Sequence, residues 1–387
     1  METNRRAALA TISIAAASTG ALSAAASDRD KRKAKFLRTL LPSRQDVANW
    51  ISRKAYPFAK YDGELGYLHI DRDFREGLDQ SICRYRYDKL DARQMHAYAT
   101  KPCRINTYGD SFTSCEQVSD AETWQEFLAG HLCEPVRNYG IGGYSVYQAY
   151  LRMKREEKRA PAKTIVFNIF DDDHVRNILG WQRFKFGVNN IAMNPTVPHV
   201  RVNLRTGMIA DRGNACPTPE SMYELTKFDS VWKMFNDDPV LNNRIDRQIR
   251  RDAGKPVPPT DCDDERLMHE GITATKRIVD RIEKYARQNN KKILYVLSYG
   301  GYIVEQFINQ KKRFDQPLVD YLKKRKLPFV DVLQAHADDF AQFKVSSRQY
   351  TKRFFVGHYN PIGNHFCAFA IKDALVKILQ PKPAAYP

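Results

Sequence analysis

The sequence predicts an α/β fold in which a parallel β-sheet carries helices on both faces. From residue 104 onward, short apolar runs typical of strands alternate with segments of helical periodicity, and this alternation indicates such a sheet. The run 163–170 (KTIVFNIF) is apolar almost throughout, as expected for a strand that is buried on both faces. Hydrophobic residues make up 43% of the chain and charged residues 28%, a balance typical of a globular protein.

Five runs are predicted to be strands of this sheet: 104–108, 135–139, 163–170, 292–299 and 328–333. Helices are predicted between them from the spacing of apolar residues and from capping residues. The predicted helices are one that starts at the capping box 119–122, one over 145–159, one with apolar residues at 278, 279, 282, 285 and 286, one that ends near 322, and a last one that begins near Pro361.

Two segments lie outside this alternation. Residues 178–262 contain many Pro, Asn and Gly residues without a clear period. We interpret them as an insertion of irregular and β structure over the ligand-binding end of the sheet, where loops often determine specificity. Within the insertion, 199–210 has the pattern of a small hairpin. Residues 28–100 are mixed and aromatic and are expected to wrap the sheet edge, which leaves 101–387 as the main domain.

The charge of the chain favours an acidic partner. Its formal net charge is +17 and its pI is near 9.5, a field that attracts anionic polysaccharide, anionic lipid headgroups or nucleic acid, although it also serves solubility alone. Lys and Arg are scattered, and no basic helix, zinc-finger spacing or aromatic RNA-binding motif occurs. Nucleic acid is therefore the weaker option.

The first 27 residues are predicted to be an export signal. Arg5 and Arg6 precede a weakly apolar, Ala-rich run over 7–26, which ends in small residues suited to cleavage. Uncleaved, the same segment would serve as an anchor and as the only membrane contact. We therefore expect a protein exported to the periplasm or secreted.

The chain has seven cysteines, an odd number. Export would permit disulfides. Cys103 and Cys133 each precede a predicted strand and form a candidate pair, with buried free thiols as the alternative.

Three short motifs carry the residues that could perform chemistry. Gly109-Asp110-Ser111 follows the first strand, and a serine at the carboxyl end of a parallel strand lies where α/β sheets bind ligands. NYGIGG at 138–143 follows the second strand, and its glycines allow a backbone N–H to approach a substrate oxygen. GHYNP at 357–361 places His358 before the last helix. Each motif alone also fits a structural turn or cap.

In this order, the three motifs resemble sequence blocks of the SGNH/GDSL hydrolase superfamily. GDSFT at 109–113 resembles the first block, NYGIGG the second and GHYNPIGNH at 357–365 the last. The resemblance spans residues 104–175 and 290–380. It implies a three-layer α/β/α sandwich whose five parallel strands have a flavodoxin-like order, and an enzyme that hydrolyses or transfers ester-linked acyl groups without a metal or organic cofactor.

The resemblance also implies a role for each motif residue. Ser111 is the nucleophile, and His358 is the base that removes its proton. The N–H groups of Ser111 and Gly143 hold the oxyanion, each donor contributing about 3 kcal/mol in comparable enzymes. The implied activity is that of an ester hydrolase of the carbohydrate esterase or deacetylase type, acting on an acylated carbohydrate or another acidic polymer.

Two positions depart from the family pattern. The Asn of the third block, which completes the oxyanion hole, is missing, and alignment places Asp172 at its position. An ionised carboxylate there would repel an oxyanion, so Asp172 must be protonated, turned away or used differently. The Asp that precedes the family's catalytic histidine is replaced by Phe355 and Val356, so another group must orient His358.

Three other interpretations fit the same residues. The motifs also suit a polysaccharide O-acyltransferase of the same superfamily. The two departures suit a non-catalytic carbohydrate-binding module that keeps the fold. The run Asp171–His174 has residue types that bind Mg²⁺, Mn²⁺ or Zn²⁺, but consecutive side chains point in different directions, which favours a polar loop.

Overall fold

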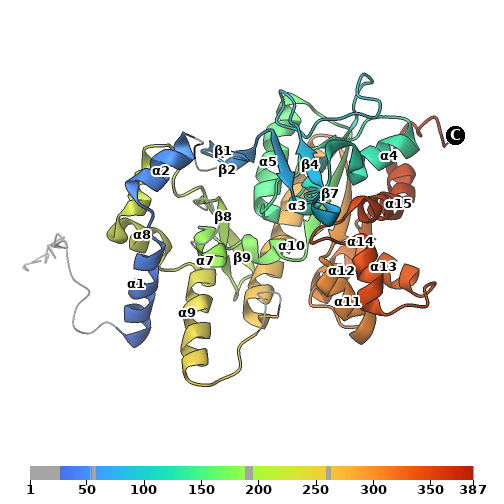
Figure 1. The fold of residues 1–387 in the computed structure, drawn as a ribbon. Helices are drawn as coiled ribbons and strands as arrows, with labels where there is room; N and C mark the ends of the chain where they lie inside the picture. Colours follow the sequence, from blue (N-terminus) through green and yellow to red (C-terminus); the bar gives the residue numbers. More distant parts are fainter. Residues whose placement is uncertain (1–26, 53, 55–57, 188–194, 259–262, 387) are drawn as a thin grey trace, which may run out of the picture.

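A five-stranded parallel sheet lies at the centre of the larger lobe (Figure 1). The structure, a computed structural model, describes residues 27–52, 54, 58–187, 195–258 and 263–386. The strands of the sheet are β5 (Ile105–Tyr108), β6 (Arg137–Asn138), β7 (Thr164–Phe170), β10 (Lys292–Ser298) and β11 (Phe329–Asp331). In space they are ordered β11-β10-β7-β5-β6, which is the expected flavodoxin-like order. The direction of strand addition reverses between β5 and β7, and sheets of this kind bind ligands beyond the carboxyl ends of the strands at that point.

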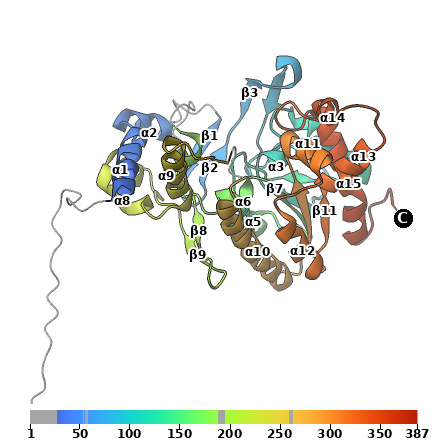
Figure 2. The ribbon, with the colours of Figure 1, turned by 90° about the horizontal axis from the view of Figure 1, so that it is seen from below.

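Helices cover both faces of the sheet, which confirms the three-layer architecture (Figure 2). One face carries α5 (Val146–Arg159), α10 (Glu265–Gln288) and α12 (Gln316–Lys324). The other face carries α4 (Trp124–Leu132), α13 (Val332–Phe340) and α15 (Pro361–Ile378), with α11 (Gly301–Gln310) and α14 (Ser347–Phe354) packed beside them. Among the described residues, no helix has both the length and the apolar character that a bilayer span requires.

Two predicted helices differ in detail from the observed ones. The capping box at Ser119 starts a short 3-10 turn, η2 (Asp120–Glu122). Helix α4 begins only afterwards, where the Thr123 side chain accepts from a main-chain N–H of the first turn. The helix expected to end near residue 322 is two helices, because Lys311 adopts a left-handed conformation (φ 56°) that closes α11.

The insertion contains helices in addition to the predicted hairpin and irregular structure. Its elements are α7 (Arg183–Phe186), β8 (His199–Asn203), β9 (Met208–Arg212), η3 (Ser221–Thr226), α8 (Phe228–Phe235) and α9 (Pro239–Asp252). In the sequence, Pro239 looks like a helix breaker. In the structure it occupies the first turn of α9, directly after Asp238, whose carboxylate accepts the first main-chain N–H groups.

The first half of the N-terminal segment packs against the insertion, although the sequence predicts that it wraps the sheet edge. Helix α1 (Asp28–Leu40) contacts α8 and α9, and α2 (Arg44–Ile51) contacts η3, so these elements form a second lobe beside the sandwich (Figure 1). Two hairpins follow, and they are formed by β1 (Ala59–Asp62), β2 (Gly66–His69), β3 (Arg72–Arg75) and β4 (Ile82–Tyr85). These hairpins reach the sandwich. The predicted export signal lies outside the described residues except for Ser27, which caps α1.

The six cysteines that the structure describes are all free thiols. Cys103 and Cys133, the candidate pair, do not form a bridge. Burial raises the pKa of the Cys103 thiol, so it forms the reactive thiolate less readily than an exposed thiol does.

A buried arginine from the N-terminal segment fixes the loop after α3 (Ser111–Ser114). Arg93 is 2% exposed, and its Nε donates to Asp120 at 2.8 Å. Its other nitrogens donate to the main-chain carbonyls of Ser114, Cys115 and Val118. Because these carbonyls belong to one turn of chain, a single side chain sets the path of the loop.

The variant Arg93→Met should lower the free energy of unfolding by about 3–5 kcal/mol, because it leaves the buried Asp120 carboxylate without its cation. Urea denaturation measures this change. The exposed Arg84→Met, from the neighbouring hairpin, is the control and should change stability by no more than about 0.5 kcal/mol. Equal effects of the two substitutions would contradict the assigned role of Arg93.

Candidate active site

The residues predicted from the motifs lie where the carboxyl ends of β5 and β7 meet. Ser111 starts α3 directly after β5, and Asp172 follows β7. Strand β5 ends at Tyr108, which pairs with Phe167, so β7 extends three residues further. This edge of the sheet is the reversal point of the strand order, the place where such folds bind ligands.

Ser111 is nearly buried, and Asp110 holds its hydroxyl. The side chain of Asp110 caps α3 by accepting from the Phe112 N–H at 3.0 Å, and its Oδ2 accepts from the Ser111 hydroxyl at 3.1 Å. Within the described residues, the main-chain N–H of Ser111 donates no hydrogen bond. It belongs to the first turn of a helix, where such groups lack an intrahelical partner and can receive an anion.

The turn after β6 lies against the same place. The Ile141 N–H donates to the carbonyl of Gly109 at 3.2 Å, which joins this turn to the GDS segment. Gly143 has φ +79°, and a Cβ there would lie 2.7 Å from the Tyr67 hydroxyl, so only glycine fits. In the described part of the chain, the Gly143 N–H also donates no hydrogen bond. Both proposed oxyanion donors are therefore available to a ligand.

Gln117 holds His358 by two hydrogen bonds. The His358 main-chain N–H donates to Gln117 Oε1 at 2.6 Å, and His358 Nδ1 lies 3.1 Å from the same oxygen. Gln117 Nε2 donates to the Glu76 carbonyl at 3.2 Å, which fixes the amide oxygen toward His358. Since an amide oxygen only accepts, Nδ1 of a neutral His358 carries the proton and Nε2 is the free base.

The surroundings of Gln117 leave it little freedom. Its main-chain N–H donates to the Tyr85 hydroxyl at 2.7 Å, and that hydroxyl donates to the Glu76 carboxylate at 2.6 Å. Gly357 has φ +135°, and a Cβ there would lie 2.5 Å from Gln117 Oε1. Gln117 was not found from the sequence. Its only sequence signal is its place six residues after the serine of the GDS motif.

Glu116 brings a negative charge close to His358. Its Oε2 lies 4.0 Å from His358 Nε2, and its Oε1 lies 3.9 Å from His69 Nε2. Arg72 lies 3.6 Å from the same carboxylate. Burial lowers the pKa of His69 well below its usual value, so His69 is neutral and does not compete for this charge.

Ser111 and His358 reach the same end of the sheet without a hydrogen bond between them. The Ser111 hydroxyl is bonded to Asp110, and the imidazole is bonded to Gln117. The ring of Phe112, the residue after Ser111, lies 5.1 Å from the His358 ring between centroids. Burial raises the pKa of Asp110, and the nearby Arg176 guanidinium opposes that rise.

Arg176 lies at the centre of the charged groups beside Ser111, on the short helix α6 (Asp173–Arg176). Its guanidinium group lies 3.0 Å from both Asp172 and Asp173, and 3.5 Å from Asp110. It also donates to the carbonyl of Tyr144 at 3.2 Å. This side chain therefore links the ends of β5, β6 and β7.

Asp172 is turned toward cations and is ionised. It pairs with Arg176 and with Lys185 of the insertion. Burial by itself would raise the pKa of Asp172, but the two cations outweigh it and hold that pKa below its usual range. An ionised carboxylate has no proton to donate to an oxyanion, so Asp172 does not replace the missing Asn as a donor. Neither Arg176 nor Lys185 was predicted from the sequence.

The other residues of the Asp171–His174 run face separate partners. Asp171 accepts from the Gly300 N–H at 2.8 Å, and Asp173 accepts from the Phe170 N–H at 3.1 Å. His174 Nδ1 contacts the Thr275 hydroxyl at 2.8 Å. Among the described residues there is no group of three or more side chains placed to hold a metal ion.

Comparison with solved structures gives distant likenesses. No protein-family model and no curated protein matches the chain. A lipolytic protein of the G-D-S-L family from Desulfitobacterium hafniense DCB-2 is 13% identical (TM-score 0.36, 70% of this chain and 98% of that chain). The acetyl xylan esterase AlAXEase is 14% identical, with a TM-score of 0.36, and the match covers 71% of this chain and 100% of that chain. LAE5, an alpha/beta hydrolase from the metagenome of Lake Arreo, Spain, is 13% identical, with a TM-score of 0.37, and the match covers 70% of this chain and 93% of that chain. Likeness at this level does not assign a function.

Asp171 should make stability fall as pH rises. Burial raises the pKa of Asp171 to about 8, so between pH 5 and 7 the folded protein keeps a proton that the unfolded chain releases. Unfolding is therefore favoured as pH increases in this window. Asp171→Asn does not titrate, so its free energy of unfolding relative to the wild type should increase by up to about 1.4 kcal/mol per pH unit.

Urea denaturation of both proteins at pH 5, 6 and 7 measures this slope. The exposed substitution Asp229→Asn is the control for general effects of removing a carboxylate. If the free energies of unfolding of Asp171→Asn and the wild type differ by the same amount at all three pH values, Asp171 is ionised throughout this range.

Proposed function

We propose that the protein is an ester hydrolase that acts on an acylated carbohydrate through a Ser111 acyl-enzyme, with His358 as the general base. The observation that carries this proposal is the pair of hydrogen bonds between His358 and Gln117. These bonds fix the imidazole in the tautomer that leaves Nε2 unprotonated, on a ring that packs against Phe112, the residue after Ser111. A serine hydroxyl needs such a base to become a nucleophile.

In the first half of the reaction, the Ser111 hydroxyl leaves Asp110 and forms a hydrogen bond to His358 Nε2. Its proton moves to His358 Nε2 while Oγ bonds to the ester carbonyl carbon. The carbonyl oxygen becomes an oxyanion and accepts from the N–H groups of Ser111 and Gly143. Collapse of this intermediate breaks the bond to the alcohol oxygen, which leaves with the proton from His358 Nε2.

In the second half, a water molecule takes the place of the alcohol. His358 Nε2 removes a proton from the water as its oxygen bonds to the acyl carbon. The oxyanion forms again at the same two N–H groups, and its collapse releases the carboxylic acid. The proton on His358 returns to the Ser111 oxygen, which restores the enzyme.

Two residues divide the role that one carboxylate has in related mechanisms. Gln117 fixes the tautomer and orientation of His358 but, as a neutral amide, adds no charge. Glu116, 4.0 Å from His358 Nε2, supplies the negative charge that stabilises the imidazolium formed during each proton transfer.

The ion pairs of Asp172 fit the same proposal. An uncompensated carboxylate near the oxyanion would raise the energy of the tetrahedral intermediate. Lys185 and Arg176 neutralise Asp172 and keep its oxygens directed at themselves. The oxyanion is then held by main-chain N–H groups alone.

Labelling with a fluorophosphonate probe tests the nucleophile. The wild-type protein should be labelled, and Ser111→Ala should lose both the label and the hydrolysis of p-nitrophenyl acetate. Ser114→Ala, a matched change on the same helix, should keep both. Persistent labelling of Ser111→Ala would refute the assignment of Ser111. Absence of labelling and turnover in the wild type would favour the non-catalytic binding module.

A second experiment tests the role of Gln117. Gln117→Met keeps the length of the side chain but removes the acceptor, so kcat/KM for p-nitrophenyl acetate should fall by on the order of 10²-fold. Gln117→Glu restores an acceptor and adds a charge that stabilises the imidazolium. It should therefore recover activity relative to Gln117→Met and move the acidic limb of the pH–rate profile to higher pH.

Thermal unfolding of both variants separates a catalytic effect from a folding defect. An unchanged kcat/KM in a folded Gln117→Met protein would show that Gln117 does not position the base. An identical pH–rate profile in Gln117→Glu would show that the residue at 117 does not contact the titrating group.

A further inference from the structure

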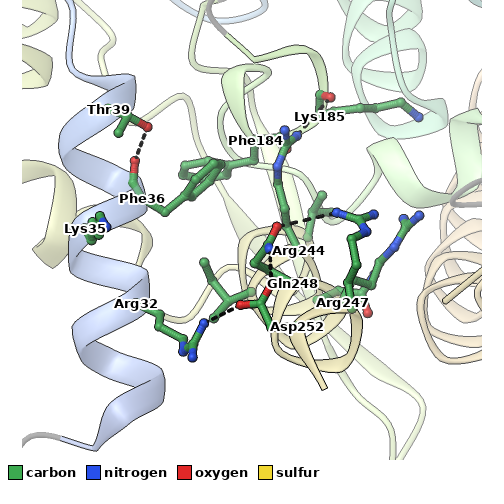
Figure 3. A pocket seen from close by; sticks show the side chains of 14 residues that line it. Arg32, Lys35, Phe36, Thr39, Phe184, Lys185, Arg244, Arg247, Gln248 and Asp252 are labelled. Atoms are coloured by element: carbon green, nitrogen blue, oxygen red, sulfur yellow. Dashed lines mark hydrogen bonds and ion pairs between the residues drawn. The ribbon is translucent and has the colours of Figure 1, made fainter. Parts of the chain in front are cut away.

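The second lobe contains a cavity with a strongly basic lining (Figure 3). The cavity has a volume of about 610 Å³ and lies between α1, α7 and α9. Of its fourteen lining residues, six are Lys or Arg and only Asp252 is acidic. The basic residues are Arg32, Lys35, Lys185, Arg244, Arg247 and Arg251. Small-molecule sites are typically ~300–1,000 Å³, so the cavity has room for a few sugar rings.

Carboxylates of the protein balance only some of these charges. Arg32 pairs with Asp252 at 2.6 Å (Figure 3), and Lys185 pairs with Asp172. Lys35 and Arg251 form no ion pair with any residue that the structure describes; Arg251 donates only a long hydrogen bond, 3.4 Å, to the Gln248 amide. Two cations of the lining therefore have no carboxylate, and an anionic ligand would supply one.

The rest of the lining favours an acidic sugar over a nucleic acid. Single-stranded nucleic acids bind on exposed aromatic rings, where their bases stack. Here Phe184 is 1% exposed and packs against Trp181, and the Arg244 guanidinium lies over the Phe36 ring at 5.1 Å. Asn243 also lines the cavity, and its amide makes no hydrogen bond with the described residues, so it is available to a sugar hydroxyl.

Helix α7 connects the cavity to the candidate active site. Lys185 of this helix lines the cavity and also pairs with Asp172. Asp172 in turn pairs with Arg176, which lies 3.5 Å from Asp110 beside Ser111. A chain of ion pairs therefore connects the cavity to the candidate active site. A polymer bound in the cavity would be held beside the lobe that contains Ser111.

We propose that this cavity is an ancillary binding site for a carboxylate-bearing stretch of the polysaccharide whose ester Ser111 cleaves. The proposal rests on the proposed function and specifies its substrate class as an acylated polyuronate. Carboxylates spaced along the sugar chain would pair with Lys35 and Arg251, and hydroxyl groups would bond to Asn243.

Calorimetric titration of the Ser111→Ala protein with a galacturonic acid trimer tests the proposal without turnover of the ligand. At low ionic strength the trimer should bind at least about tenfold more tightly than the neutral maltotriose. The double variant Lys35→Glu/Arg251→Glu, made in the same background, should weaken trimer binding by at least about tenfold. Lys323→Glu/Lys324→Glu on α12, with the same change of net charge, should not.

Three results would overturn the proposal: equal affinity for the trimer and maltotriose, equal loss in the two double variants, or tighter binding of a short oligothymidylate that is lost with Lys35 and Arg251. The hydrolysis of p-nitrophenyl acetate by proteins that keep Ser111 is measured in parallel and should be the same with and without the Lys35 and Arg251 substitutions. A wild-type protein that binds the trimer but cleaves no ester would refute the proposed function and leave the binding site in place.

Discussion

The guanidinium group of Arg176 is the interaction on which the candidate site depends. It lies among the carboxylates of Asp110, Asp172 and Asp173 and also donates to the carbonyl of Tyr144. Buried charges persist only when they are paired, so the arginine and the three carboxylates are retained as a set. Asp110 follows β5, the Tyr144 carbonyl follows β6, and Arg176 itself follows β7. The contacts of Arg176 therefore hold together the turns that carry Ser111 and Gly143.

The carboxylates around Arg176 are not equivalent, because their environments shift their pKa values in different directions. Burial raises the pKa of Asp110 and that of Asp173, whereas Lys185 and Arg176 hold the pKa of Asp172 below its usual range against the effect of burial. Of the three carboxylates, Asp172 is the one whose ionised form is stabilised most, because it is directed at two cations. This arrangement is consistent with the proposed role of the Ser111 and Gly143 N–H groups as donors to an oxyanion.

The N-terminal segment supports both parts of the proposed function. Its second hairpin supplies Tyr85 and the Glu76 carbonyl, which hold Gln117 in place, and Arg93 fixes the loop that carries Gln117. Its first helix supplies Lys35 to the basic cavity. The segment is thus a structural part of the site and not only a cover for the sheet edge. Six basic residues that are scattered in the sequence meet in space at the cavity between α1, α7 and α9.

The sequence by itself determined the parallel sheet and its layers, because these depend on local patterns: alternating periodicity and a strand buried on both faces. It also placed Ser111 and Gly143 in turns after strands and His358 before the last helix, and their catalytic roles stay predictions. Only the tertiary structure decided which groups surround them. Gln117 contacts His358, although 241 positions of the chain separate the two residues. Lys185 reaches Asp172 from the insertion, whose helices were not predicted because the segment contains a proline and many charged residues. Side-chain hydrogen bonds and ion pairs of this kind follow from packing between distant segments, which no local pattern records.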